Sequence, residues 1–430
     1  MHARHWPAPA SLVDNGMGKV GTRVEERHSS SDSATHEAGA LWIWGLATTQ
    51  LIAWGSLFYS LSLFMVPAVR ELGWSTAGFS LGLSLTLLAA GLISPWVGAL
   101  IDRYGGRLIL AAGNLLAGGM FLLWSVTSRL PAFYVICLGI GAAQAMTLYD
   151  AGFAILVREL RSNAPRAITV MTLVAGFAST IFLPLTGTVI DRFGWREALL
   201  LLAAVNVLIA APANFALLRR SRASAFAHHE RLRLKAIASQ SLRSSSFRIL
   251  FAVFAAWGFV FSALTMHIVP LLVDRGLPMS RIIWLLALIG PAQVGARLIA
   301  HLFPVLTTAR WLGRFATVGL AVAMGLLAAA GGSEIWLAGF FILYGVSNGA
   351  FTIARGLAIS EYVSVASFGA TAGLLAVATG ISMAGAPTTI GIIRSSTGSY
   401  SAGVSLMLAT AILAALLYWI LSVRAKIADR

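Results

Sequence analysis

One arginine, Arg297, lies inside a long apolar stretch of the chain, in the run GPAQVGARLIAHLF. An ionised side chain inside a membrane span costs at least about 2.5–3.5 kcal/mol, so such a residue is a candidate for function. The planar guanidinium group suits two-pronged capture of a carboxylate. The alternatives are that Arg297 reaches the membrane interface or pairs permanently with an acid of the protein.

Asp150 is the only acid that we place well inside a span, and it follows Tyr149 in LYDAGFAILV. A carboxyl group in this position can carry a coupling proton. Two structural alternatives stay open. Asp150 could pair with the arginines of the run DRYGGR, or it could pair directly with Arg297.

Five further polar residues are candidates for substrate contacts. His267 can titrate near neutral pH or hydrogen-bond a substrate, although a lone histidine on a packed helix is more often satisfied by a neighbour. Buried hydroxyl and amide groups in lipid need partners, so the others are candidates to line a polar cavity. They are Tyr59, Gln50, Tyr149 and Gln293.

The composition of the chain indicates which class of protein contains these residues. The chain has 430 residues, of which 58% are hydrophobic and 11% charged, and its mean hydropathy is +0.82. Soluble globular proteins are about 25% charged, so soluble enzymes, nucleic-acid binders and disordered proteins are excluded. The single cysteine, Cys137, can form no internal disulfide. We expect an all-α membrane protein embedded in the lipid bilayer.

A span of the hydrocarbon core takes roughly 20 apolar residues as a helix. Twelve stretches meet this length, near 41–69, 77–100, 108–128, 131–157, 167–190, 195–218, 249–273, 281–305, 312–330, 335–354, 367–392 and 401–422. Residues 1–40 are polar and Ser-rich and predict a disordered cytoplasmic tail without a secretory signal peptide. A basic linker, 219–248, separates six spans in 41–218 from six in 249–430.

The basic residues alternate between the two sides of the predicted spans. Of the 31 Lys and Arg residues, 23 fall in the two tails and the loops after even-numbered spans, and seven fall in the other loops. Arg297 is the remaining one, within a span. Because Lys and Arg collect on the cytoplasmic side, both termini are expected in the cytoplasm, in the cell inner membrane. The net charge of +15 therefore reports topology and not nucleic-acid binding.

The loop between spans 2 and 3 reads GALIDRYGGR and contains Gly98, Asp102, Arg103, Gly105 and Arg107. We expect Gly98 to permit close helix approach. Asp102 is expected near the N-terminal end of span 3, where a carboxylate meets the positive end of the helix dipole. The two arginines can reach acids or carbonyls of a neighbouring helix. Together these residues predict a latch that closes the cytoplasmic side in one conformation.

The pattern G-x-x-x-D-R-x-G-x-R resembles the loop 2–3 signature of the major facilitator superfamily. The resemblance runs from residue 41 to the end of the chain and implies two pseudo-symmetric six-helix bundles that rock around a central site. Gly176 and Pro184 in span 5 match Gly380 and Pro387 in span 11, and they predict bent helices at equivalent places. Packing alone would also favour small residues there.

Three segments are similar to the monocarboxylate-transporter-like branch and its bacterial oxalate/formate-exchanger relatives. They are WGSLFYSLSLFMVPAVRELGWS, FSALTMHIVPLLVDRGL and GPAQVGARLIAHLF. In that branch an arginine of span 8 binds the substrate carboxylate, and Arg297 occupies the matching position. Ser62, or a close neighbour, stands where animal members have a lysine, and Gln293 stands where they have an acid. The lysine–aspartate proton relay therefore does not carry over.

These features predict a transporter and exclude an enzyme, because the sequence has no H-E-x-x-H, Walker or CxxC motif and implies no cofactor or metal. We expect a monomeric secondary carrier of a small organic anion, a monocarboxylate, working by alternating access with H+ as a candidate coupling ion. One alternative is a drug efflux carrier, but Leu183 precedes Pro184 where the antiporter signature has glycine. The other is a transporter-like sensor.

Overall fold

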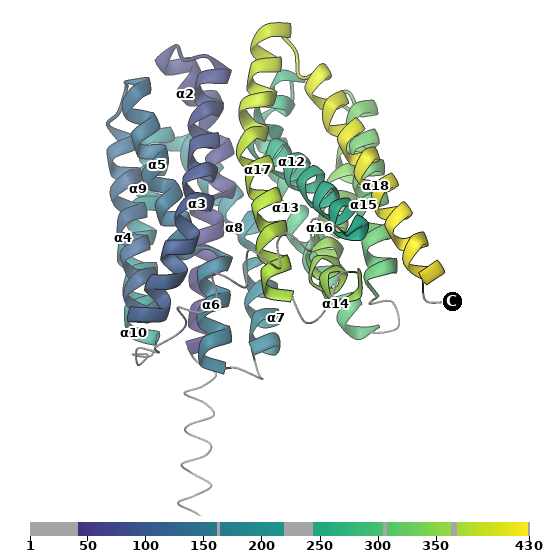
Figure 1. Ribbon diagram of the computed structural model, residues 1–430. Coiled ribbons are helices and arrows are strands. Elements are labelled where there is room, and N and C mark those ends of the chain that lie inside the picture. Colours follow the sequence, from purple (N-terminus) through teal and green to yellow (C-terminus); the bar gives the residue numbers. More distant parts are fainter. Residues whose placement is uncertain (1–41, 161–163, 219–243, 304–307, 363–367, 429–430) are drawn as a thin grey trace, which may run out of the picture.

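The computed structural model describes residues 42–160, 164–218, 244–303, 308–362 and 368–428. The regular elements in these ranges are all helical, and they form twelve spans that are long and apolar enough to cross a membrane (Figure 1). The predicted all-α fold with twelve spans is confirmed. The tail 1–40 and residues 219–243 of the linker lie outside the described residues.

The first six spans contain several short helices. The first span consists of a helix at 42–57, the 3-10 helix η1 (Tyr59–Phe64) and α2 (Met65–Leu72). The others are α3 (Thr76–Tyr104), α4 (Gly106–Ser125), α5 (Leu130–Thr147) with α6 (Tyr149–Leu160), α7 (Ala164–Ala175) with α8 (Ala178–Phe193), and α9 (Trp195–Ala204) with the π-helix η3 (Val205–Ala210) and α10 (Ala211–Leu217).

The last six spans are α12 (Ser245–Asp274), α13 (Met279–Ala287) with α14 (Ile289–Leu302), α15 (Ala309–Ala329), α16 (Glu334–Tyr362), α17 (Phe368–Thr397) and α18 (Ser401–Ala428). The seventh span begins four residues earlier than 249, within the predicted linker. The reason is an N-cap: the Ser244 hydroxyl accepts a hydrogen bond from the backbone N–H of Phe247 at 3.4 Å, which satisfies a free donor of the first turn.

The predicted bends in spans 5 and 11 have different outcomes. Span 5 is broken where α7 ends, at Gly176, as predicted. In span 11, α17 continues as one helix through Pro387, so the helix is not interrupted there and its bend stays a prediction. Proline removes a helical hydrogen bond to the carbonyl four residues before it. Here that carbonyl, of Met383, accepts a hydrogen bond from the Ser262 hydroxyl at 2.8 Å instead.

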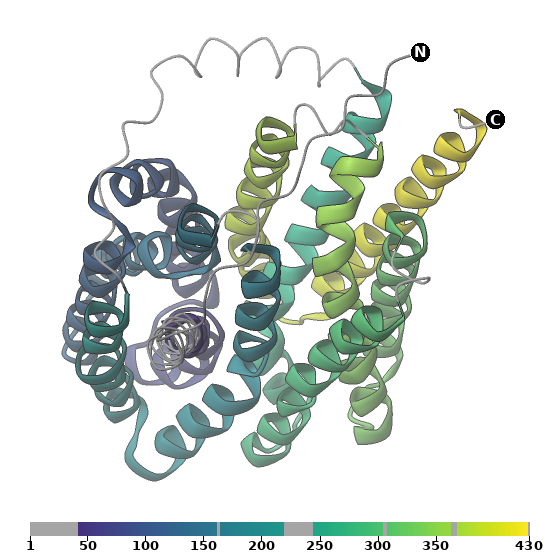
Figure 2. The same cartoon turned by 90° about the horizontal axis from the view of Figure 1, so that it is seen from below.

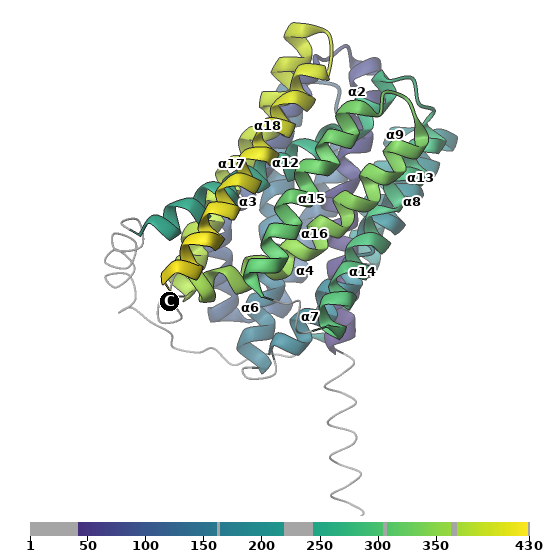
Figure 3. The same ribbon diagram turned by 90° about the vertical axis from the view of Figure 1, so that its right-hand side faces the viewer.

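The two sets of six spans meet along two main seams, α3 with α17 and α8 with α13 and α14 (Figures 1 and 3), and η1 also packs against α12. Small residues make the approach close. A Cβ atom at Gly391 of α17 would lie 2.6 Å from the Ser80 hydroxyl oxygen of α3. A Cβ atom at Gly290 of α14 would lie 1.8 Å from the Thr180 hydroxyl oxygen of α8. The view along the spans shows the two sets on either side of these seams (Figure 2).

Residue 42 begins the first span at one end of the bundle, which we call the terminal face. We call the other end the opposite face. Ala77, in the first turn of α3, donates its backbone N–H to the Ser395 hydroxyl of α17 at 3.3 Å. Ser84 and Thr388 join the same two helices through their hydroxyl groups at 2.7 Å. Polar contacts of the α3–α17 seam therefore lie from the opposite face toward the middle of the spans.

Candidate functional site

Two polar stripes face each other on neighbouring helices of the second half. Gln293 and Arg297 share one face of α14, and Asn348 and Thr352 share one face of α16, because residues four apart are neighbours on a helix. The Asn348 amide donates to Gln293 Oε1 at 3.2 Å, and Arg297 Nη2 donates to the Thr352 hydroxyl at 3.4 Å. The close approach depends on Gly349, where a Cβ atom would lie 2.4 Å from the Gln293 carbonyl oxygen.

The same two side chains of α14 also reach the first half. Arg297 Nη1 donates to the backbone carbonyl of Thr172 at 2.6 Å, and Gln293 Nε2 donates to that of Gly176 at 2.7 Å. Both acceptors lie where α7 ends, at the break in span 5. The break in one half thus supplies the main-chain oxygens that hold the polar stripe of the other half.

Arg297 is 8% exposed, and its known partners are neutral oxygen atoms. Its Nε donor has no hydrogen-bond partner among the described residues. Neither structural alternative from the sequence fits, since the side chain is buried and its hydrogen bonds in the described part of the chain go to carbonyl and hydroxyl groups. Burying a cation among neutral groups is unfavourable, and an anion beside it would offset that cost.

Two tyrosines of the first half complete the surroundings of the guanidinium group. The Tyr59 hydroxyl interacts with Gln293 and with the charge of Arg297, and the Tyr149 hydroxyl interacts with Arg297. Tyr59 is the first residue of η1 and Tyr149 the first of α6, so the interruptions of spans 1 and 4 position both. Trp54 packs against both rings, with centroid distances of 6.1 and 4.6 Å. The structure therefore brings Tyr59, Tyr149 and Gln293 together around Arg297, as predicted.

Gln50 stabilises the interruption of span 4 next to Tyr149. Its buried side chain donates from Nε2 to the carbonyl of Thr147, the last residue of α5, at 2.6 Å. Gln144, which the sequence reasoning missed, does the same for span 1 by donating to the Leu57 carbonyl at 2.6 Å. Each amide thus fixes the carbonyl next to an interruption, and an amide inside an apolar run was the signal in both cases.

Asp150 lies in the first turn of α6, where the helix dipole favours a carboxylate. Its charge interacts with Arg355 of α16, a residue that sequence reasoning had placed outside span 10. Both residues are exposed. Arg355 follows Thr352 by three positions and so continues the polar stripe of α16. The position in that stripe was the signal that could have identified it.

His267 belongs to another place in the molecule, so its expected role in the substrate site is not supported. Its Nε2–H donates to the Pro387 carbonyl at 2.9 Å and lies 3.3 Å from the Ser80 hydroxyl, and its Nδ1 accepts from the Tyr400 hydroxyl at 3.2 Å. These partners belong to α17, α3 and the segment before α18. The partners of Arg297 belong to α6, α7 and α16.

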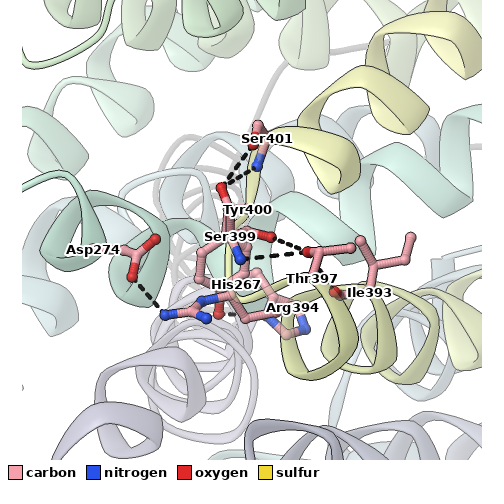
Figure 4. A network of polar contacts seen from close by, with 8 residues as sticks. All are labelled: His267, Asp274, Ile393, Arg394, Thr397, Ser399, Tyr400 and Ser401. Atoms are coloured by element: carbon pink, nitrogen blue, oxygen red, sulfur yellow. Dashed lines mark hydrogen bonds and ion pairs between the residues drawn. The ribbon is translucent and has the colours of Figure 1, made fainter.

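The surroundings of His267 form a corner network at the opposite face (Figure 4). Tyr400 is buried there, and burial raises the pKa of its hydroxyl, which stays protonated and can donate to the imidazole. Arg394 pairs with Asp274 at 2.7 Å and lies 5.5 Å from the centroid of the Tyr400 ring. The network joins α12 to α17 and to the start of α18, and its role is to hold this corner.

The loop 2–3 motif differs from expectation in two respects. Asp102 lies in the last turn of α3, so by its backbone it ends span 2 and does not begin span 3; its side chain is outside the described residues. Gly98 does not serve close helix approach, because a Cβ atom there would meet nothing within 4 Å. Gly105 is required for its conformation, with φ of 81° between α3 and α4.

The two arginines of the motif contact aromatic rings. Arg103 lies 5.2 Å from the ring centroid of Tyr104, and Arg107 lies 3.9 Å from that of Phe215 in α10. Neither contact crosses to the second half. The closing of the latch stays a prediction, and so does the gating role of Asp102.

A cavity lies between the halves next to the arginine site. Its lining includes Tyr59 of η1 and Asn348 of α16, which also contact the residues around Arg297. Apolar side chains make up most of the remaining wall, among them Leu183, Phe261, Leu264, Ile268, Leu286, Ile289 and Phe341. The site thus has a charged end and an apolar end.

Comparisons with known proteins agree with this architecture. Residues 43–307 match the sequence profile of the Major Facilitator Superfamily. The chain is similar to monocarboxylate transporter 11 of Homo sapiens, with 26% identity over 355 residues, which cover 80% of this chain and 70% of that protein.

Solved structures show the same fold. A variant of the nucleoside transporter NupG superposes with a TM-score of 0.75 at 14% identity, covering 89% of this chain and 99% of that one. A bacterial homologue of the human lysosomal transporter Spinster, in an inward-facing and unoccupied conformation, gives a TM-score of 0.68 at 15% identity, covering 91% and 98%.

Proposed function

Because this chain belongs to the Major Facilitator Superfamily, we propose that its central site carries a small organic anion, a monocarboxylate, across the inner membrane by alternating access. Membership makes the chain a multi-pass membrane transporter and not an enzyme. The anion, the coupling ion and the sidedness are the proposed part. The similarity to a monocarboxylate transporter supports the choice of substrate.

The observation that carries the proposal is the environment of Arg297. The guanidinium group is 8% exposed, hydrogen-bonds to neutral oxygens, and keeps a buried Nε donor without a partner in the described part of the chain. Burying a charge is unfavourable unless an opposite charge and further hydrogen bonds compensate it. A substrate carboxylate supplies both, because its two oxygens match the two-pronged donor pattern of arginine.

The link to Thr172 connects binding to movement. Arg297 Nη1 donates across the junction between the halves. Nη1 carries two N–H groups, so a carboxylate at this nitrogen either uses the second or displaces the Thr172 carbonyl. Displacement weakens a contact that holds the two halves together. Substrate binding then changes the relative stability of the two arrangements, which is the requirement for a ligand to shift a conformational equilibrium.

Asp150 is the proposed proton carrier. Its carboxylate interacts with the charge of Arg355 across the two halves. Protonation removes the negative charge and with it this attraction, so a proton on Asp150 and an anion on Arg297 both alter contacts between the halves. From the charge distribution of the sequence we infer that these residues lie nearer the cytoplasmic side and that both termini are in the cytoplasm.

Counterflow in proteoliposomes tests the proposal. Wild-type protein preloaded with unlabelled pyruvate is expected to accumulate labelled pyruvate, whereas Arg297→Ala and Arg297→Lys are not, because a lysine cannot reproduce the two-pronged fork. Leu298→Ala, an exposed neighbour on α14, is the matched control and should retain counterflow.

Three results would contradict the proposal. Counterflow of carboxylates by a stable Arg297→Ala protein would remove the arginine from the substrate site. Counterflow of chloramphenicol in place of carboxylates would identify a drug carrier. Carboxylate binding without any flux would identify a sensor.

A further inference from the structure

We infer that the carried anion is a monocarboxylate with an apolar body, a branched alkyl chain or an aryl ring, and not a small hydrophilic acid or a dianion. This inference rests on the proposed function, since it assumes that the carboxylate binds Arg297. It adds the chemistry of the rest of the substrate, which the cavity next to that residue determines.

The cavity adjoins the arginine site through two of its lining residues. Tyr59 lines the cavity, and its hydroxyl interacts with Gln293 and Arg297. Asn348 also lines it and donates to Gln293 at 3.2 Å. A carboxylate on Arg297 therefore places the remainder of the same molecule in this cavity.

The wall of the cavity is apolar. Seven of its twelve lining residues are Leu, Ile or Phe, and none of the twelve, all in the described part of the chain, is charged. Two aromatic rings, Phe261 and Phe341, belong to this wall, together with Leu264 of α12. An apolar body gains free energy in proportion to the area that it removes from water.

The serine and threonine hydroxyl groups in the wall are engaged with their own helices. Ser62 donates to the Tyr59 carbonyl at 3.1 Å, and Thr265 donates to the Phe261 carbonyl at 2.7 Å. Their protons are not available to a substrate. The buried Tyr344 hydroxyl, without a hydrogen-bond partner among the described residues, offers one contact. A body with several hydroxyl or amide groups would leave water without enough equivalent partners, which is unfavourable.

A second carboxylate has no cation to meet in this cavity. The next basic residue along the polar stripe of α16 is Arg355, and the order Asn348, Thr352, Arg355 along the helix places it beyond Arg297 as seen from the cavity. The charge of Arg355 also interacts with Asp150. A dianion that extends from Arg297 into the cavity would therefore place its other carboxylate against apolar side chains.

A comparison of four substrates in the wild-type protein tests the inference without any substitution. Proteoliposomes are assayed for counterflow of 4-methyl-2-oxopentanoate, phenylpyruvate, pyruvate and oxalate. The two acids with apolar bodies are expected to half-saturate at concentrations at least about tenfold lower than pyruvate, since each methylene in an apolar pocket contributes roughly that much discrimination or more. Oxalate is expected to be the poorest substrate.

The outcomes separate this inference from the function on which it rests. Preference for pyruvate or oxalate overturns the apolar body and leaves the carboxylate carrier standing. Failure of all four acids in counterflow overturns both.

Substitutions of Leu264 in the wall provide the second test. Leu264→Trp fills the cavity and should raise the half-saturation for 4-methyl-2-oxopentanoate at least about tenfold while pyruvate changes less than about twofold. Leu264→Ala enlarges it and should shift the preference toward phenylpyruvate. The matched control is Ile342→Trp, at a position next to Phe341 that is 47% exposed.

If the tryptophan variant does not fold, as judged by gel filtration, the alanine variant decides the matter. An unchanged ratio of phenylpyruvate to 4-methyl-2-oxopentanoate in a folded Leu264→Ala protein overturns the inference.

Discussion

Nη1 of Arg297 donates to the backbone carbonyl of Thr172 at 2.6 Å, and this bond joins α14 of the second half to α7 of the first. Because the acceptor is a main-chain oxygen, substitution at position 172 does not remove it. The geometry of the bond depends on where α7 ends, at the break beside Gly176. The charge that we assign to substrate binding is therefore also part of the junction between the halves.

The stability of Arg297 variants distinguishes a substrate site from a permanent ion pair. The described partners of Arg297 are neutral, so Arg297→Ala is expected to lower the free energy of unfolding by only about 1–3 kcal/mol, the cost of its lost hydrogen bonds. Thermal unfolding of the purified protein in detergent measures this. A loss of several kcal/mol that Asp150→Asn restores would show that the two residues form a buried pair.

Asp150→Asn tests the proposed proton carrier. Asparagine resembles the protonated carboxyl, so exchange of substrate for substrate should persist while accumulation driven by a pH gradient is lost. Uptake into proteoliposomes with and without an imposed gradient measures both activities. Asp191→Asn, an exposed acid in α8, is the control. Gradient-driven accumulation by the Asp150→Asn protein would exclude this residue as the carrier.

Asp102→Asn tests the latch. If Asp102 contributes to a closed arrangement of the cytoplasmic side, the substitution changes the equilibrium between two states and not the contacts to substrate. Such coupling is typically worth about 1–3 kcal/mol, so the transport rate should fall by roughly 5- to 150-fold with substrate affinity changed only a few-fold. Wild-type flux at equal expression would show that Asp102 does not gate.

The corner network predicts a structural role for His267. His267→Ala leaves the Pro387 carbonyl and the Tyr400 hydroxyl without their partners. Each unsatisfied buried group costs about 1–3 kcal/mol, so the melting temperature should fall while the half-saturation for substrate stays within a few-fold. Tyr400→Phe, which removes one of these bonds, should have a smaller effect. A tenfold change in substrate affinity at normal stability would show that His267 contributes to substrate binding.

The orientation predicted from charge is tested by fusions after Arg430. A reporter that fluoresces only in the cytoplasm should be bright, and alkaline phosphatase at the same point should be inactive. The reverse result would contradict the 23-to-7 distribution as a topology signal.

Much of the fold could be predicted from the sequence because its signals are local. An apolar run of about 20 residues identifies a span wherever it packs, and Arg297 stands out because a charge inside such a run is rare. Gly176 likewise indicated the break in span 5. Each of these signals can be read without knowing any neighbour in space.

The features that escaped prediction depend on partners distant in the chain. The break at Leu148 in span 4 carries no glycine or proline, and it is fixed by Gln50, almost a hundred residues earlier. Arg355 was assigned to a loop because a charge near the end of an apolar run indicates its end, whereas α16 continues to Tyr362. The role of His267 follows from three partners on other elements, which no local pattern reveals.

The six 3-10 residues of η1 determine the rotation of everything that follows them in span 1. A 3-10 helix turns about 120° and rises about 2.0 Å per residue, against about 100° and 1.5 Å in an α-helix. Rewinding η1 as an α-helix would therefore turn α2 by roughly 120° and draw it back by roughly 3 Å. Glu71 at the end of α2 accepts a hydrogen bond from Trp195 Nε1 at 2.6 Å and pairs with Arg196. That clamp holds α2 in its present angular register and so opposes such a rewinding of η1.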